Sequence, residues 1–295
     1  MDLYSRLHGR FLFDDRRKQA KVLVCLLAGY KRELWPFVLP RLENALLDVD
    51  VCVVSPGLWL DELAELCRRQ EWSYLRTTTN DVSLAQNICY RLHENASMIV
   101  KIDEDMFLLP NTISALLEDY QNIKMQGVVD PGIVAPMIPL NGFCYRYLLE
   151  MLGRLEEFEA LFGTARLATA GLPIHSNPSA ARWIWEATAP LSATAARLAV
   201  SESRRLLCPI QFSIGMIAFE RSFWQEIGYL PVYRHRLLVG NSTLGGDEAY
   251  MCARGVETAR PVVVTTAALA GHFSFGPQYP VLRELLNVRP ELFAE

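Results

Sequence analysis

Hydrophobic runs of strand length alternate with amphipathic segments of helix length along the first half of the chain. Residues 21–29 (KVLVCLLAG) are almost continuously apolar, which is typical of a strand buried on both faces. Residues 82–95 instead carry apolar side chains at helical spacing, with Asp81 or Ser83 as the predicted N-cap. By these criteria, strands are predicted at 21–29, 49–55, 72–77 and 97–102, and helices at 33–47, 58–70, 82–95 and 111–123. This order predicts an α/β protein with a mostly parallel sheet flanked by helices.

The pattern changes after residue 140. Residues 141–207 are mainly helical or irregular, and no Gly/Ser-rich linker separates them from the rest of the chain. Strand signals return at 208–220 and 261–276, with helix candidates at 222–228 and after the loop that starts at 245. We therefore expect a single domain over residues 1–295, with an N-terminal arm at 1–20 and a mainly helical insertion at 141–207.

Composition adds limits to this prediction. The chain has 295 residues, of which 51% are hydrophobic and 21% charged, as in globular proteins with a full-sized core. The formal net charge of −4 argues against a general affinity for nucleic acid. None of the seven cysteines forms a C-x-x-C pair, so we expect a reduced cytoplasmic chain without disulfides or a zinc site. The longest apolar stretch is too short to span a bilayer, so no stable membrane insertion is expected.

Three consecutive acids interrupt the apolar pattern. Asp103, Glu104 and Asp105 follow the predicted strand SMIVKI, and apolar residues resume immediately. In open parallel sheets, ligands bind beyond the carboxyl ends of the strands. Two carboxylates at i and i+2 on such a turn can converge on Mg²⁺ or Mn²⁺, which prefer oxygen ligands. A solvated acidic turn is the alternative, but the strand end and the apolar flanks favour a site.

Two later segments carry further candidate groups. The sequence GGDE places Asp247 and Glu248 after two glycines, where adjacent acids can supply a general base or simply begin a helix. His272 follows the last strand-like run and is a candidate nitrogen ligand for a metal. Each signal is weak alone, and their order along the chain is more specific than any one of them.

With these motifs in this order, the chain resembles the GT-A family of nucleotide-sugar glycosyltransferases. The resemblance covers residues 21–140 and 205–276, and the segments that carry it are 21–33, 80–87, 99–105, 212–228, 245–255 and 271–273. It implies a GT-A (Rossmann-like) fold with Mn²⁺ or Mg²⁺ as cofactor. It also implies transfer of a hexose or pentose from a nucleotide-sugar, most commonly a UDP-sugar, to a hydroxyl acceptor.

The resemblance assigns roles residue by residue. Asp103, Asp105 and His272 match the metal positions, and Glu248 matches the usual catalytic base with Asp247 as its rival. The donor-binding positions are matched by Ala28, Tyr30, Arg32, Ser55, Asn80, Asp81, Asn87, Lys101, Asp103 and Glu104. No metal-ligand role is predicted for Glu104. Ser55 stands where many related enzymes place an acid that binds the base.

The acceptor is left open between a glycan, a lipid-linked sugar, a protein and a hydroxylated DNA base. The insertion is expected to shape the acceptor pocket, with Trp183 and Trp185 either stacking on a sugar or packing in the core. A second class of function is a sugar-phosphate nucleotidyltransferase, although Gly29 alone is a poor match for the Gly-rich loop of such enzymes. A third is a non-catalytic protein that binds sugar nucleotides.

Overall fold

The computed structural model describes residues 10–45, 48–200, 204–232, 245–273 and 276–293. Its strands form a ten-stranded sheet in the order β1-β4-β3-β2-β5-β9-β7-β10-β6, and β8 also pairs with β10. The strands are β1 (Phe11–Asp14), β2 (Val22–Leu27), β3 (Asp50–Pro56), β4 (Ser73–Thr77), β5 (Met98–Asp103), β6 (Met106–Leu108), β7 (Ile133–Met137), β8 (Arg205–Cys208), β9 (Met216–Glu220) and β10 (Val262–His272).

Most of the sheet runs in one direction. β4, β3, β2 and β5 pair in parallel, and β7 and β10 also pair in parallel. β9 is antiparallel to both β5 and β7, so the two parallel groups share one direction. The antiparallel strands β1, β6 and β8 lie against β4 and β10. The predicted α/β fold with a mostly parallel sheet is therefore confirmed.

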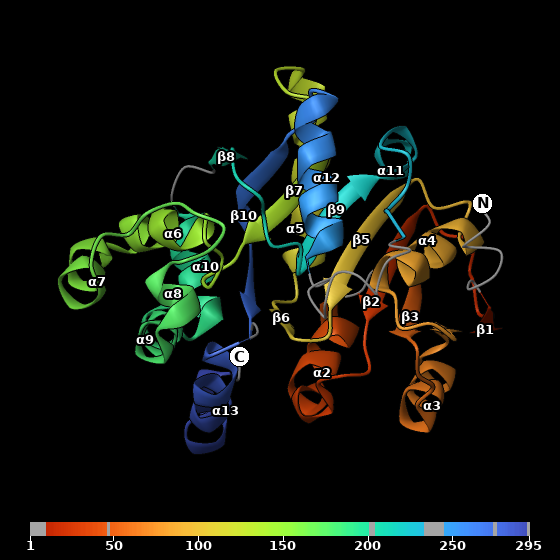
Figure 1. Cartoon of the computed structure of the whole chain (residues 1–295), viewed down its shortest axis with the longest axis horizontal. Coiled ribbons are helices and arrows are strands. Elements are labelled where there is room, and N and C mark those ends of the chain that lie inside the picture. The colour runs from red at the N-terminus through yellow and green to blue at the C-terminus, as the bar shows by residue number, and fades with distance from the viewer. Residues whose placement is uncertain (1–9, 46–47, 201–203, 233–244, 274–275, 294–295) are drawn as a thin grey trace, which may run out of the picture.

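Helices lie where the sequence predicts helical segments. They are α2 (Trp35–Ala45), α3 (Asp61–Gln70), α4 (Val82–Leu92), α5 (Thr112–Gln126), α11 (Arg221–Glu226) and α12 (Gly246–Glu257). The helix α13 (Gln278–Val288) was not predicted, and it packs against the helices inserted after β7. A 3-10 turn, η1 (Arg32–Leu34), precedes α2, and η2 (Pro290–Leu292) follows α13. Figure 1 shows α4 and α12 lying in front of the sheet. These two helices bring polar groups toward the candidate site described below.

The segment after β7 is built from five helices. They are α6 (Cys144–Leu152), α7 (Leu155–Phe162), α8 (Pro173–Ser176), α9 (Pro178–Thr188) and α10 (Leu191–Ala199). Figure 1 shows them gathered beyond β10, on the side of the sheet away from β1. Trp185 of α9 is buried and its ring stacks on Phe293, with centroids 4.8 Å apart, so this tryptophan belongs to the core. Trp183 is half-buried and contacts the ring of Phe158.

The predicted strand at 208–220 is divided in the structure. β8 ends at Cys208, β9 begins at Met216, and the residues between them follow an irregular path toward the candidate site. β6 was not predicted as a strand. It pairs with the end of β10, so the apolar residues after the acid triplet extend the sheet. All seven cysteines are buried free thiols. Among the helices described, none has the length and apolar character needed to cross a membrane.

Candidate active site at the ends of strands β5 and β10

Glu104, the middle acid of the triplet, is bound to the loop that follows β2. Its carboxylate accepts hydrogen bonds from the backbone N–H groups of Gly29 (2.9 Å), Tyr30 (2.7 Å) and Lys31 (3.0 Å). The indole N–H of Trp35 donates a fourth, at 2.6 Å. Burial raises the pKa of Glu104, and these donors oppose the rise by stabilising the charged form. Glu104 therefore fixes the shape of this loop.

Asp105 is the centre of a buried ion cluster. Its side chain is almost inaccessible, and its Oδ2 pairs with the ammonium group of Lys31. The same oxygen lies 3.3 Å from Nε2 of His272. Burial alone would raise the pKa of Asp105, but its interactions with His272 and Lys31 outweigh burial and lower the pKa well below its usual range. Asp105 is thus held as a carboxylate inside the protein.

Strand pairing explains how two residues far apart in sequence meet here. In the antiparallel β6–β10 pair, His272 lies opposite Met106, and the N–H of Phe273 donates to the carbonyl oxygen of Asp105 at 3.1 Å. Gly215 leaves room for the imidazole. A Cβ at this position would lie 3.4 Å from the ring of His272 and 2.9 Å from Sδ of Met106.

Asp103 has a different partner from Asp105. Its Oδ1 lies 2.7 Å from the ammonium of Lys101, which also donates to the carbonyl oxygen of Ile214 at 2.7 Å. The backbone N–H of Asp103 donates to the carbonyl oxygen of Gly215 at 2.8 Å. The start of β9 is thereby tied to the end of β5. The two predicted metal ligands of the triplet are each neutralised by a separate lysine.

Glu248 reaches the same place from helix α12. Its Oε1 accepts a hydrogen bond of 3.2 Å from the N–H of Ile214, the residue whose carbonyl oxygen binds Lys101. Burial raises the pKa of Glu248, and the nearby carboxylates of Asp247 and Asp103 raise it further against the opposing charge of Lys101. A carboxylate with a raised pKa is better suited to accept a proton than an ordinary surface glutamate.

Asp247 is anchored instead to helix α4. Its Oδ2 accepts a hydrogen bond of 3.0 Å from the side-chain amide of Gln86. Gln86 is fully buried and is held in turn by the hydroxyl of Tyr90, which donates to its Oε1 at 2.8 Å. These contacts explain why the adjacent acids differ, with Asp247 serving as a link between α4 and α12.

Two predicted donor-binding residues lie on the loop that Glu104 holds. Tyr30 is 55% exposed, and its hydroxyl donates to the carbonyl oxygen of Pro56 at the end of β3. Arg32 is paired with Glu62 at the surface. The exposed side chain of Tyr30 is suited to stack on a planar ligand above the ends of β2 and β3.

Ser55 and Ala28 are part of the packing between β2 and β3. The hydroxyl of Ser55 is fully buried, donates to the carbonyl oxygen of Ala28 at 2.8 Å and accepts from the hydroxyl of Tyr74 at 3.1 Å. Ala28 is itself buried. Ser55 therefore stabilises the strand ends beneath any ligand that binds there.

The remaining predicted donor residues have structural partners of their own. Asp81 caps α4 by accepting a backbone hydrogen bond of 2.9 Å. Asn87 is buried, accepting from the indole of Trp224 at 2.9 Å and donating to the carbonyl oxygen of Leu230 at 2.8 Å. Asn80 is exposed at the loop before α4.

The predicted metal ligands are brought together only in part. The ligand atoms of Asp103, Asp105 and His272 are not all within 4.8 Å of one another, and in the described part of the chain a different group meets that condition. Asp105 and His272 do fit a divalent cation. Their ligand atoms are 3.3 Å apart, and Nε2 of His272 is buried with no hydrogen-bond partner among the described residues. A cation completed by substrate phosphates and water needs no more than such a pair from the protein.

Two contacts that build this site could not be predicted from the sequence. Lys31 was visible as a basic residue after the first strand, but nothing in the sequence indicates that it pairs with Asp105. Gln86 lies in a helix with the periodicity of an ordinary amphipathic segment, so nothing in the sequence indicates its contact with Asp247. Both contacts join segments that are distant in sequence.

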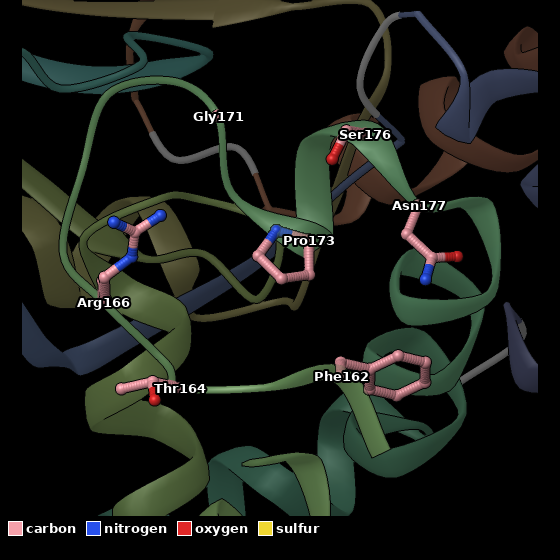
Figure 2. A pocket seen from close by; sticks show the side chains of 7 residues that line it. All are labelled: Phe162, Thr164, Arg166, Gly171, Pro173, Ser176 and Asn177. Carbon is pink, nitrogen blue, oxygen red and sulfur yellow. The ribbon is translucent and has the colours of Figure 1, made fainter. Parts of the chain in front are cut away.

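A polar pocket of about 550 Å³ lies in the helical segment. Figure 2 shows Arg166 and Thr164 on the chain that follows α7, and Ser176 and Asn177 across the pocket at the junction of α8 and α9. The same connecting chain approaches the site: the hydroxyl of Thr169 donates to the carbonyl oxygen of Gln211 at 3.4 Å. The side chain of Gln211 in turn lies beside Gly245, at the start of α12.

Comparisons with known proteins find similar folds at low sequence identity. No family model matches the chain, and no curated protein matches it. Among solved structures, it is similar to Staphylococcus aureus TarS 1–349 in complex with UDP, with 13% identity, a TM-score of 0.48, and coverage of 91% of this chain and 66% of TarS 1–349. It is also similar to GalNAc-T7 with UDP, GalNAc and Mn²⁺, with 11% identity, a TM-score of 0.46, and coverage of 88% and 45%. The chain thus spans slightly less than two thirds of the first protein, and no residue role is transferred from either.

Proposed function

We propose that this protein is a metal-dependent glycosyltransferase that transfers a sugar from a nucleotide-sugar, a UDP-sugar in the first instance, to a hydroxyl acceptor. One observation carries the proposal. The Asp105–His272 pair, which fits a divalent cation, shares the carboxyl ends of the parallel strands with Glu248, a half-buried carboxylate of raised pKa. A metal-binding pair beside a candidate general base is the arrangement that transfer from a diphosphate leaving group needs.

The residues divide the reaction between them. Glu248 accepts the proton of the acceptor hydroxyl, whose oxygen forms a bond to the anomeric carbon of the donor. The bond from that carbon to the diphosphate breaks, and the nucleoside diphosphate leaves with the electron pair. A direct displacement of this kind inverts the anomeric centre. Lys31 and Lys101 place two positive charges beside the departing diphosphate.

Asp105 and His272 are the residues that would hold Mn²⁺ or Mg²⁺. When bound, the ion supplies Lewis-acid stabilisation of the charge on the leaving diphosphate. Asp103 keeps Lys101 in place and orients the donor. Tyr30 stacks on the base, because its exposed side chain stands over the ends of β2 and β3.

The helical segment is proposed to bind the acceptor. Its polar pocket contains a cation, Arg166, and hydroxyl and amide groups that can hydrogen-bond to a saccharide. The chain between Arg166 and Gly171, which both line the pocket, contacts Gln211 through Thr169, and Gln211 lies near Gly245, two residues before Asp247. This proximity supports placing the acceptor on the side of the site that carries Glu248.

The test is a panel of nucleotide-sugars incubated with the protein, with Mn²⁺ or with EDTA, followed by detection of free nucleoside diphosphate. We expect release from one donor class in Mn²⁺ and none in EDTA. Full turnover in EDTA would overturn metal dependence, and pyrophosphate release from a nucleoside triphosphate and a sugar phosphate would favour the nucleotidyltransferase. Activity on duplex DNA that carries hydroxylated bases would assign the acceptor to nucleic acid.

A further inference from the structure

A second group of metal-binding side chains lies beneath helix α4, in the interior of the fold. The thiols of Cys52 on β3 and Cys89 on α4 and a ring nitrogen of His93 all lie within 4.8 Å of one another. In the part of the chain that the structure describes, this is the one such group of three or more His, Cys, Asp or Glu residues. Both cysteines are fully buried and His93 is 3% exposed. We call these residues, with Cys25, the thiol cluster.

The hydrogen bonding of His93 prepares its ring to act as a ligand. Nδ1 lies 2.9 Å from the carbonyl oxygen of Cys89. Because a carbonyl only accepts, Nδ1 carries the hydrogen and Nε2 keeps its lone pair. Nε2 is buried and has no hydrogen-bond partner in the part of the chain that the structure describes, and burial lowers the pKa of His93, which favours the neutral ring. A buried lone pair without a partner is costly, and a metal ion would satisfy it.

Cys25 lies beside this group and is the candidate for a fourth ligand. It is fully buried on β2 and is the direct partner of Cys52 in the parallel β2–β3 register. Burial raises the pKa of the Cys25 thiol, and the neighbouring thiol of Cys89 raises it further. Cys25 lies outside the 4.8 Å group, so it would need a small movement to complete a tetrahedral set. Three cysteines and one histidine are a common structural zinc set.

Burial raises the pKa of the Cys25 and Cys89 thiols well above the usual value, so the metal ion itself would have to ionise them on binding. Each thiol that becomes a ligand releases one proton, so two thiolates balance Zn²⁺ and a third leaves a single negative charge. Arg221 donates to the carbonyl oxygens of Tyr90 and His93 at the end of α4, and its positive charge partly opposes the rise in the pKa of Cys89. The positive charge of Lys101 partly opposes the rise in the pKa of Cys25.

We propose that Cys52, Cys89 and His93, completed by Cys25, bind one Zn²⁺ ion that fastens α4 to the sheet. The site is structural and closed, since all its ligands are buried. It is separate from the Asp105–His272 pair and does not depend on the proposed function. Because α4 also carries Gln86, the partner of Asp247, the ion would stabilise the helix on which one side of the candidate active site rests.

The test begins with the protein purified under reducing conditions and dialysed to remove loosely bound ions. We expect about one zinc per chain by elemental analysis, since structural zinc sites bind tightly. Cys89→Ser and Cys52→Ser should lose the zinc, whereas Cys144→Ser should keep it. Cys144 is also fully buried but lies on α6, so it controls for the removal of a core thiol.

A second measurement keeps the proposal testable if the cluster variants do not fold. The wild-type protein, stripped of metal and titrated with Co²⁺, should develop the near-ultraviolet absorption of thiolate-bound cobalt. Asp105→Asn should keep the zinc, which separates this ion from one at the strand ends. The proposal is overturned if the wild-type protein contains no zinc and shows no cobalt absorption. It is also overturned if Asp105→Asn loses the zinc while Cys89→Ser keeps it.

Discussion

The strand-end site (Asp103, Asp105, Lys31, Glu248 and His272) and the thiol cluster both gather metal-binding side chains, but they do so in opposite surroundings. In the first, each aspartate faces a lysine, and the negative charge of Asp105 persists inside the protein. In the second, neutral thiols and a neutral imidazole lie among apolar side chains. Carboxylates suit magnesium or manganese, thiolates suit zinc, and an imidazole is present in both groups. The two proposed ions are therefore distinguished by oxygen ligands in one place and sulfur ligands in the other.

The largest expected effect comes from Asp105. In Asp105→Asn the carboxylate that faces both Lys31 and His272 is lost, so we expect turnover of the donor to fall by about 10³-fold or more. Asp103→Asn, the matched variant two residues away, should cost about tenfold, because Asp103 lies outside the metal-binding pair. Both rates are measured by release of nucleoside diphosphate in Mn²⁺. Equal losses in the two variants would contradict the asymmetry that the structure shows.

Glu248 should show the next largest effect, together with a distinct pH dependence. A base must be deprotonated to act, so the wild-type rate should rise with pH through a pKa above that of an ordinary glutamate. Glu248→Gln should lower kcat about 10²- to 10³-fold and remove this acidic limb from the profile. Asp247→Asn changes the contact with Gln86 and removes one of the charges that raise the pKa of Glu248, so it should keep the limb but move it to lower pH. If the rate of Glu248→Gln still falls at low pH in the same way, the catalytic base is a different residue.

Glu104 should matter for stability more than for chemistry. Glu104→Ala leaves three backbone N–H groups and the indole of Trp35 without their acceptor, which we expect to cost about 3 kcal/mol or more in the free energy of unfolding. Urea denaturation followed by circular dichroism measures this loss. Glu65→Ala removes an exposed ion pair with Arg68 and should cost under about 0.5 kcal/mol. A similar loss in both variants would show that the loop does not depend on Glu104.

Lys31 should give the smallest of these effects, and one that depends on metal. Lys31→Met leaves Asp105 buried without its cation, so in EDTA the free energy of unfolding should fall by about 2 kcal/mol. Mn²⁺ should restore much of this loss, because a divalent ion at Asp105 and His272 replaces the missing charge. Thermal melting with and without Mn²⁺ is the measurement. Arg32→Met, whose partner Glu62 is exposed, should change little under either condition.

The contrast between the two regions also explains what could be predicted from sequence. Asp103 and Asp105 were visible because charges interrupt an apolar run, and the α/β alternation placed them at a strand end. The thiol cluster was invisible for the opposite reason. A buried cysteine behaves as a small hydrophobic residue and leaves the apolar pattern intact, so Cys25 and Cys52 simply extended the predicted strands.

Other features depended on pairing between distant segments, which periodicity does not report. β6 is short, and its identity as a strand comes from its register with the end of β10. The link between Lys31 and Asp105 requires the loop after β2 to fold back over β5, and Glu104 holds it there. The expectation that Ser55 contacts the base was drawn from its position after the second strand, and its burial depends on Tyr74 from the neighbouring strand.

The loop at residues 29–31 has a further consequence for the choice of ligand. Successive backbone N–H groups that point to one centre form an anion-binding nest, the device with which many nucleotide-binding loops grip phosphate. Here the nest is already filled, because the carboxylate of Glu104 acts as a built-in anion. A phosphate chain that reaches residues 29–31 meets backbone N–H groups that already bind the carboxylate of Glu104. An enzyme that handles nucleoside triphosphates through a glycine-rich loop would need that nest open.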